Sequence, residues 1–167
     1  QFIEDELHKE GIQTQFVNVD GITRINVFTQ VVSTSEEFKL VNQGPSVSQP
    51  QEETLLKIIE NMNTEDFLFV SGSHPEGITY TTYEKIAKAA QLRRFKLILD
   101  TSADFVPDLL KYRPYLIKPN DEELAEWFGL INPSLEEIKD CGQKLLEKGA
   151  ENVLVSLGEK GAILFTP

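Results

Sequence analysis

Two kinds of hydrophobic pattern follow one another along the chain, and they change near residue 50. Residues 12–43 contain three segments rich in Val, Ile, Phe and Thr, with partial alternation of apolar and polar positions, at 13–19, 24–32 and 37–42. Turn-forming residues separate them at 20–21 and 33–36. The pattern predicts an antiparallel meander, which has too few strands to form a core alone. We therefore expect it to pack against the main body, against residues outside this chain or against a second subunit.

The remainder of the chain alternates between helical apolar stripes and short apolar runs. The stripes predict helices at 51–62, 80–90, 106–111, 121–129 and 134–148, and the runs predict strands at 67–70, 97–99, 115–117 and 153–155. Strands of this length that alternate with amphipathic helices are typical of a parallel sheet. A turn at 158–161 leads to a further apolar run at 162–165, which predicts a hairpin. The predicted fold class is α/β.

Polar or small residues follow each of the predicted parallel strands. In chain order the endings are Ser71-Gly72-Ser73, Asp100-Thr101-Ser102, Lys118-Pro119-Asn120 and Ser156-Leu157-Gly158. The carboxyl ends of parallel strands meet at one edge of a sheet, and open α/β sheets bind ligands at that edge. Four such endings in succession therefore predict a ligand groove there.

The third ending carries the most information. Pro119 disfavours helical backbone at Lys118, so the strand should stop at that residue. Asn120 is a good N-cap for the next helix, and Glu123 stands at the position that completes a capping box. A cation, an amide and a carboxylate are thereby directed at the mouth of one strand. A well-capped helix explains the same residues without a ligand, so this pattern alone leaves both interpretations open.

Two further features could bind an anion. The loop 71–77 contains small residues whose backbone N–H groups could hold a phosphate or a sugar hydroxyl, and the guanidinium of Arg24, in an otherwise apolar predicted strand, suits bidentate capture of phosphate. An ordinary connecting loop and a surface charge are the alternatives. The chain has neither a P-loop nor a G-x-G-x-x-G segment after a strand, which disfavours both familiar phosphate loops and a dinucleotide-binding domain.

Composition narrows the class of protein. At 167 residues with 40% hydrophobic residues, the chain is long enough for a globular domain, and it contains no apolar run of the length that spans a membrane. Its net charge is −11, from 16 basic and 27 acidic residues, and no basic cluster interrupts the acidity, which argues against a nucleic-acid partner. The single cysteine, Cys141, lies at helical spacing with apolar residues; it predicts core packing and fits a cytoplasmic location.

Taken together, these segments resemble the PfkB (ribokinase-like) carbohydrate kinase family, and most nearly its bacterial 1-phosphofructokinases and tagatose-6-phosphate kinases. The matching pieces are Thr23-Arg24-Ile25-Asn26-Val27, Asn42-Gln43-Gly44-Pro45, Ser71-Gly72-Ser73 with Pro75 and Gly77, Leu99-Asp100-Thr101-Ser102, Lys118-Pro119-Asn120 with Glu123-Leu124, and Val155-Ser156-Leu157-Gly158 with Gly161-Ala162. The resemblance implies a Rossmann-like parallel sheet flanked by helices, formed by residues 1–11 and 44–167, and a small antiparallel β lid within 12–43. In relatives the lid strands often pair between subunits, so a homodimer through the lid is expected.

The resemblance also implies a role for individual residues. Arg24 would bind the phosphate already on the sugar with Asn26 close by, and the loop of Ser71, Gly72 and Ser73 would face the same group. Asn120 and Glu123 match an Asn-x-x-Glu motif that organises Mg²⁺ and its waters around the phosphates of ATP. The remaining nucleotide contacts implied by the resemblance are Lys118, Ser156, Gly158 and Gly161.

The implied reaction is ATP-dependent phosphorylation of fructose 1-phosphate to fructose 1,6-bisphosphate, with tagatose 6-phosphate as the alternative acceptor. The family's catalytic Asp, in a Gly-Ala-Gly-Asp motif, and its early Gly-Gly-Lys-Gly sugar-binding segment do not occur in these residues. We therefore expect a fragment, cut at both ends and inactive alone. A non-catalytic binding relative is the second alternative. His74 and Glu76 stand where relatives often carry Leu and Pro, which leaves the sugar preference open.

Overall fold

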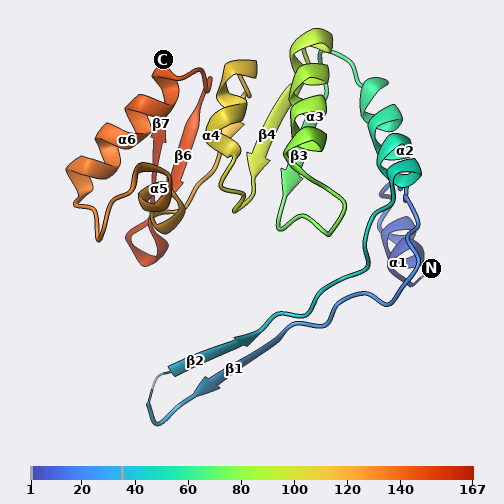
Figure 1. Ribbon diagram of the computed structural model, residues 1–167, viewed down its shortest axis with the longest axis horizontal. Coiled ribbons are helices and arrows are strands. Elements are labelled where there is room, and N and C mark those ends of the chain that lie inside the picture. The colour runs from blue at the N-terminus through green and yellow to red at the C-terminus, as the bar shows by residue number, and fades with distance from the viewer. Residues whose placement is uncertain (1, 35) are drawn as a thin grey trace.

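A five-stranded sheet organises the computed structural model, which describes residues 2–34 and 36–167 (Figure 1). Its order is β3-β4-β5-β6-β7; β3 to β6 run parallel, and β7 returns antiparallel to β6. The strands are β3 (Phe67–Ser71), β4 (Lys96–Asp100), β5 (Leu116–Ile117), β6 (Val153–Ser156) and β7 (Ala162–Phe165). The α/β class, the four parallel strands and the final hairpin are therefore confirmed.

Helices connect these strands, and four of the described helices begin at polar residues expected of N-caps. Capping boxes start α2, α3, α5 and α6 at Ser48, Thr79, Asn120 and Ser134. The helical elements are α1 (Phe2–Lys9), α2 (Gln49–Glu60), α3 (Tyr80–Arg93), α4 (Val106–Leu109), η1 (Leu110–Tyr112), α5 (Asp121–Phe128), α6 (Leu135–Glu147) and η2 (Gly158–Lys160). Local sequence therefore predicts most element boundaries to within a few residues.

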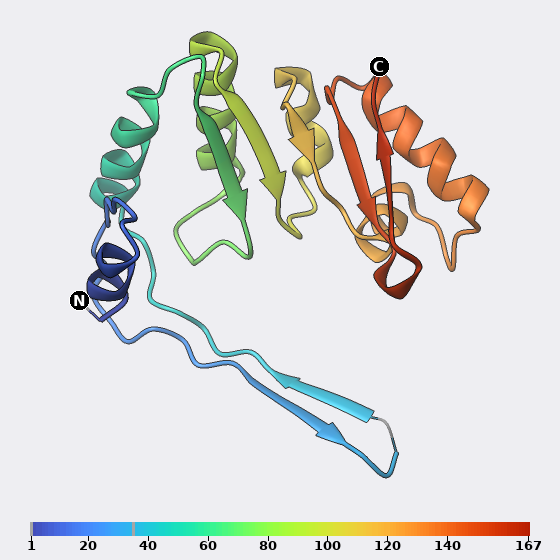
Figure 2. The ribbon, with the colours of Figure 1, turned by 180° about the vertical axis from the view of Figure 1, so that it is seen from behind.

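The core lies between the sheet and the helices α3 and α6, which are in front of the strands in Figure 1 and behind them in Figure 2. Helix α2 packs beside α3 and adds Ile59 to the same core. Its centre is formed by Leu97 and Ile117 of the sheet and Leu145 of α6, each at most 2% exposed. Burial of each such side chain stabilises the fold by about 1.5–3 kcal/mol. Cys141 is also buried there, and burial raises the pKa of its thiol. The predicted packing role of this cysteine is thus confirmed.

One glycine brings α6 and β7 close together. A Cβ added at Gly142 of α6 would lie 2.4 Å from the Phe165 ring of β7. On the other side of the sheet, Phe67 and Phe69 of β3 are 48% and 67% exposed. The sheet therefore has one face that the helices of this chain cover and a second, partly apolar face that remains open at β3 (Figure 2).

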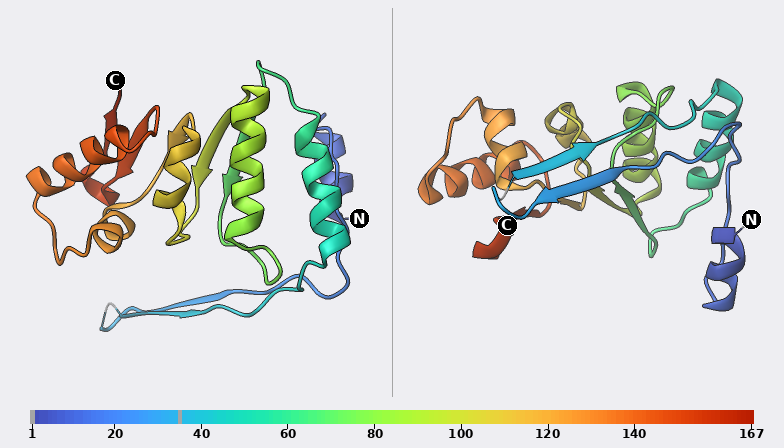
Figure 3. Two further views of the ribbon diagram at one scale, coloured as in Figure 1. Left: turned by 45° about the horizontal axis from the view of Figure 1, so that its top comes forward. Right: turned by 90° about the horizontal axis from the view of Figure 1, so that it is seen from below.

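A two-stranded hairpin, β1 (Val27–Val31) and β2 (Glu36–Leu40), extends beneath the edge at which the parallel strands end (Figures 1 and 3). The predicted three-stranded meander is wrong, because residues 13–19 form no strand and Arg24 precedes β1. Val17 and Val19, two positions apart, instead line a cavity against the body. Their alternation therefore reflects an extended segment that does not pair with a neighbouring strand. Of the predicted turn at 33–36, residue 35 lies outside the described residues.

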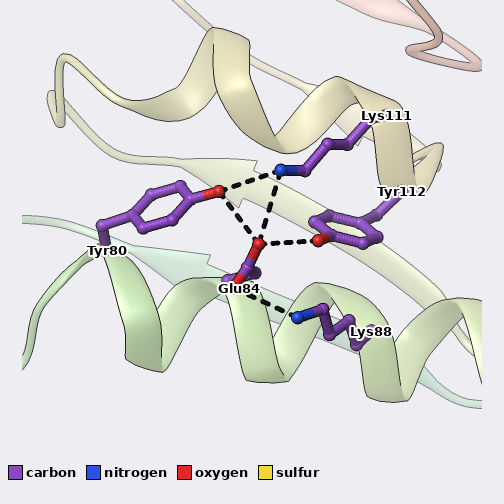
Figure 4. A network of polar contacts seen from close by, with 5 residues as sticks. All are labelled: Tyr80, Glu84, Lys88, Lys111 and Tyr112. Carbon is purple, nitrogen blue, oxygen red and sulfur yellow. Dashed lines mark hydrogen bonds and ion pairs between the residues drawn. The ribbon is translucent and has the colours of Figure 1, made fainter.

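A polar network ties α3 to the segment that contains α4 and η1 (Figure 4). The carboxylate of Glu84 accepts hydrogen bonds from Tyr112 at 2.7 Å and from Tyr80 at 3.1 Å. Lys88 and Lys111 lie 3.1 and 3.4 Å from the same carboxylate. The hydrogen bond from Tyr112, followed by that from Lys88, lowers the pKa of Glu84 from 4.5 to about 2. The charged form of Glu84 therefore stabilises the contact between these elements.

Replacement of Glu84 by Gln should flatten the acid limb of the stability profile. The lowered pKa contributes stability that is complete above pH 4.5 and is lost as the pH falls toward about 2. The difference in free energy of unfolding between wild type and Glu84→Gln should be largest near neutral pH and should close in that acid window. Urea denaturation over this pH range measures it.

Glu53→Gln is the control, because this exposed carboxylate of α2 accepts a hydrogen bond from Gln49 at 2.9 Å and takes no part in the network of Glu84. A Glu84→Gln deficit that stayed constant with pH, or that Glu53→Gln reproduced, would contradict the role given to the network.

Candidate functional site

The carboxyl ends of the four parallel strands meet at one edge of the sheet, on the side of the hairpin (Figure 1). Ser71 of β3 is the register partner of Asp100 of β4, and Gly72 N donates to Asp100 O at 2.9 Å. Beyond β5, Asn120 forms a parallel bridge with Ser156 of β6. The structure thus brings together the four polar endings that the sequence places far apart.

Asn120 and Glu123 form a reciprocal capping box at the start of α5. The Glu123 N–H donates to Asn120 Oδ1 at 2.7 Å, and the Asn120 N–H donates to Glu123 Oε2 at 3.0 Å. The preceding Pro119 is fully buried, which fixes the position of the turn. Each side chain uses one oxygen in the box and has a second polar atom that the box does not use. The cap and a ligand-binding role are therefore compatible.

Lys118 forms an ion pair that the sequence did not indicate. Its Nζ lies 3.0 Å from Asp100 Oδ1, with the two side chains 35% and 41% exposed. A pair this open to solvent contributes little to stability, on the order of 0–1 kcal/mol. Asp100 was recognised only as part of a polar strand ending; the order β4-β5 is the fact that places it against Lys118. A cation and two acids, Asp100 and Glu123, therefore flank the end of β5.

Arg24 and Ser73 meet although they are 49 positions apart in the sequence. The guanidinium Nη2 donates to Ser73 Oγ at 2.8 Å, and both residues line a cavity of about 320 Å³ with Gly44 and Pro45. Asn26 is close in sequence, and its Oδ1 is buried without a hydrogen-bond partner among the described residues. The arrangement is a cationic, hydroxyl-bearing pocket between the hairpin and the loop after β3.

The loop after β3 depends on a glycine. Gly77 has φ of 93°, and a Cβ there would lie 1.9 Å from the carbonyl oxygen of Val47. The same approach allows the Val47 N–H to donate to Glu76 O at 2.7 Å. His74, in the middle of this loop, is exposed and lies beside the rings of Tyr83 and Phe105, with centroids 6.1 and 5.8 Å away. The loop is thereby held next to Arg24.

The turn between β6 and β7 completes the edge. Gly158 and Gly161 have φ of 57° and 93°, and no atom lies within 4 Å of a Cβ built at either position. The Leu157 N–H donates to Gly161 O at 2.8 Å, which closes the turn beside Ser156. These glycines therefore make the predicted hairpin and leave open space next to it.

The structure thus groups the predicted site residues into two sets. Arg24, Asn26 and the loop 71–73 lie on the hairpin side of β3, and the second set consists of Lys118, Asn120, Glu123, Ser156, Gly158 and Gly161 at the ends of β5 and β6. Ser71 and Asp100 join the sets through the register of β3 and β4. No cluster of three or more His, Cys, Asp or Glu placed to hold a metal occurs among the described residues, and none of their helices is long and apolar enough to cross a membrane.

Comparison with known proteins identifies the family. The model of the pfkB family carbohydrate kinases matches residues 1–167. The chain belongs to the pfkB family of carbohydrate kinases. The resemblance drawn from the motifs and the Rossmann-like, ribokinase-like fold class are thereby confirmed.

Relatives within the pfkB family share a large part of the sequence. The chain is 45% identical to the D-tagatose-1-phosphate kinase of Bacillus licheniformis over 164 residues, which are 98% of this chain and 53% of the relative. It is 37% identical to the 1-phosphofructokinase of Bacillus subtilis over 166 residues, 99% of this chain and 54% of that protein. The chain therefore spans about half the length of the curated relatives that it matches.

A solved structure supports the same fold. Phosphofructokinase-2 from Escherichia coli, in complex with substrates and products, superposes with a TM-score of 0.87 at 24% identity, covering 99% of this chain and 54% of that one. At this identity the likeness shows the fold alone.

The capping role of Asn120 can be separated from any ligand role. Asn120→Ala should lower the free energy of unfolding by about 1 kcal/mol, because the helix loses its N-cap acceptor, whereas Asn120→Asp should lower it by a few tenths at most, because Asp caps about as well as Asn. Urea denaturation of the two variants measures both values. Equal losses in the two variants would mean that the box seen between Asn120 and Glu123 does not stabilise α5.

Proposed function

We propose that this chain is part of an ATP-dependent kinase that phosphorylates a ketohexose phosphate, with fructose 1-phosphate as acceptor and fructose 1,6-bisphosphate as product. The observation that carries the proposal is the edge at which Lys118, Asn120 and Glu123 lie between the end of β4 and the open turn after β6. The 1-phosphofructokinase relatives support the acceptor. The proposed location of the enzyme is the cytoplasm.

The nucleotide is proposed to bind at the ends of β5 and β6. Lys118 would contact the phosphates, and Ser156, Gly158 and Gly161 would border the nucleotide where the open turn leaves space. Mg²⁺ commonly keeps several waters and takes one or two carboxylates together with substrate phosphates. The second carboxylate oxygen of Glu123 and the amide of Asn120 fit such a water-bridged ion, which would neutralise charge on the transferred phosphoryl group.

The sugar phosphate is proposed to bind in the cavity of Arg24 and Ser73. A guanidinium and a hydroxyl 2.8 Å apart can share one phosphate, and the backbone of Ser71 and Gly72 would supply further donors. The Oδ1 of Asn26, which has no hydrogen-bond partner within the described part of the chain, would accept a hydrogen bond from a sugar hydroxyl. By the family resemblance, the carboxylate that takes the proton of the attacked hydroxyl belongs to residues outside these 167, so this chain is proposed to be inactive alone.

Tagatose 1-phosphate is the second candidate acceptor, because the D-tagatose-1-phosphate kinase of Bacillus licheniformis shares 45% of the sequence. Fructose and tagatose differ in configuration at one carbon, so one or two side chains could decide between them. His74 and Glu76, beside the Arg24 cavity, are suited to that role.

Coupled measurement of ADP release by the full-length protein tests the proposed function. The acceptors are fructose 1-phosphate, tagatose 1-phosphate and tagatose 6-phosphate, each with MgATP. Fastest turnover on fructose 1-phosphate is expected. A preference for either tagatose phosphate would contradict fructose 1-phosphate as the acceptor but would leave the proposed kinase reaction standing. Absence of turnover on all three acceptors would favour a non-catalytic binding protein.

Arg24→Ala in the full-length protein should raise KM for the sugar phosphate roughly 10- to 150-fold, which corresponds to losing a charged hydrogen bond of about 1.5–3 kcal/mol. KM for ATP should stay close to the wild-type value, because Arg24 belongs to the other set of residues. Arg93→Ala, which removes an exposed arginine at the end of α3, is the control. An unchanged sugar-phosphate KM would remove Arg24 from the site.

A homodimer through the hairpin is also proposed. In the β1–β2 register, Val27, Phe38 and Leu40 share one face and are 46–61% exposed, whereas Phe28 shares the opposite face with Lys39. A two-stranded sheet with one apolar face is marginal in water and is stabilised by a second sheet.

Phe38→Lys should therefore convert the full-length protein to monomers in analytical ultracentrifugation, because it places a charge in the proposed apolar interface. Phe28→Lys is the matched control on the other face and should leave the dimer intact. Dissociation by both variants or by neither would exclude the Val27–Phe38–Leu40 face as the interface.

A further inference from the structure

A second cationic cavity lies at the opposite edge of the sheet, where the parallel strands begin. It has a volume of about 360 Å³ and is lined by Arg94, Lys96, Arg113, Tyr112, Tyr115 and Glu151, among others. These residues come from the end of α3, the start of β4, η1 and the residues after it, and the segment before β6, at the upper edge in Figure 1. None of them belongs to the candidate kinase site.

The charge of this cavity is opposite to that of the chain. Three basic residues and one acidic residue, Glu151, line the cavity, in a protein of net charge −11. Among the described residues, the ion pairs within 4 Å do not include Arg94 or Arg113. Both arginine side chains are exposed, so their guanidinium groups are available to an anion from solution.

The backbone at both arginines is unusual. Arg94 and Arg113 have φ of 64° and 56°, in the left-handed region, where glycine is the favoured residue at the end of a helix. The chain uses glycine in the same role after α5, where Gly129 has φ of 65°. Hydrogen bonds from the backbone of Arg94 to Ala90 O at 2.7 Å and of Arg113 to Leu110 O at 2.9 Å hold these conformations. Two cationic residues therefore stand at one cavity in backbone positions that favour glycine.

The favourable interaction of cations with helix C-termini does not account for this pairing. Any basic residue in the last turn supplies that interaction, and Arg93 already occupies the last turn of α3. What Arg94 and Arg113 add is a pair of guanidinium groups from two different elements at one cavity. Lys96 also lines the cavity, and its Nζ lies 4.5 Å from the Phe67 ring centroid and 5.2 Å from the ring centroid of Tyr115.

We infer that this cavity, defined by Arg94, Lys96 and Arg113, is a binding site for a small phosphate-bearing anion, separate from the candidate kinase site. Guanidinium groups bind phosphate oxygens in bidentate geometry, and an excess of two positive charges suits a ligand with at least two negative charges. Tyr112 and Tyr115 also line the cavity. The inference stands independently of the proposed reaction.

Inorganic pyrophosphate binding to the full-length protein, measured by isothermal titration calorimetry, tests this inference. Arg94→Gly and Arg113→Gly remove the guanidinium groups and leave a residue that favours the left-handed backbone, so the fold is retained. Wild type should bind pyrophosphate saturably, and the double variant should bind it at least about 10-fold more weakly, the loss expected for one charged hydrogen bond. Arg94→Asn with Arg113→Asn is a second pair that tolerates the same backbone.

Controls separate this cavity from the other edge of the sheet. Arg93→Ala, which removes the neighbouring charge, and Lys118→Ala with Arg24→Ala, which remove cations of the candidate kinase site, should leave the affinity of the cavity unchanged. No pyrophosphate binding by wild type, equal binding by the double glycine variant, or loss of binding only with Lys118→Ala and Arg24→Ala would each overturn the inference. Loss in the glycine and asparagine pairs alone would support it.

Discussion

The alignment of four parallel strands at their carboxyl ends is the constraint on which the candidate site depends. β5 contributes only Leu116–Ile117 to the sheet, yet Ile117 is fully buried and pairs with Val153 of β6. Its position sets where Lys118 leaves the sheet, and Pro119 and the Asn120 cap then start α5 at once. Backbone pairing and core packing therefore position the side chains of Lys118, Asn120 and Glu123. The polar contacts among these side chains do not set their positions.

The free energies of the apolar and polar interactions support the view that core packing positions the polar side chains. The exposed pair of Lys118 and Asp100 contributes on the order of 0–1 kcal/mol, whereas each buried Leu or Ile of the sheet contributes about 1.5–3 kcal/mol. The Lys118 ammonium is thus held loosely enough to exchange Asp100 for a phosphate at small cost. The capping box differs, because the side chains of Asn120 and Glu123 each accept a hydrogen bond from the other residue's backbone N–H, which fixes both side chains. The rigid pair of Asn120 and Glu123 therefore lies beside the weaker, exchangeable pair of Lys118 and Asp100.

Sequence reasoning succeeded where the signal is local. Helical periodicity and the cap at Asn120 predicted α5, and short apolar runs predicted the parallel strands. The predicted strand at residues 13–19 is wrong. Alternation of apolar and polar residues indicates an extended segment against an apolar surface, but it does not indicate whether a neighbouring strand pairs with that segment. The contacts of Asp100 with Lys118 and of Arg24 with Ser73 depend on strand order and on chain segments far apart, which no local pattern contains. The left-handed backbone of Arg94 and Arg113 was likewise missed, because arginine carries no signal for it.

A crystal structure of the full-length protein with a non-hydrolysable ATP analogue and Mg²⁺ tests the central claim most directly. The account predicts that the β- and γ-phosphates lie against Lys118 and the start of α5, with Glu123 close enough to reach the metal through water and the nucleotide beside the turn of Gly158 and Gly161. Nucleotide bound elsewhere, with Lys118 still paired to Asp100 and the Asn120–Glu123 box serving its own helix alone, would contradict it.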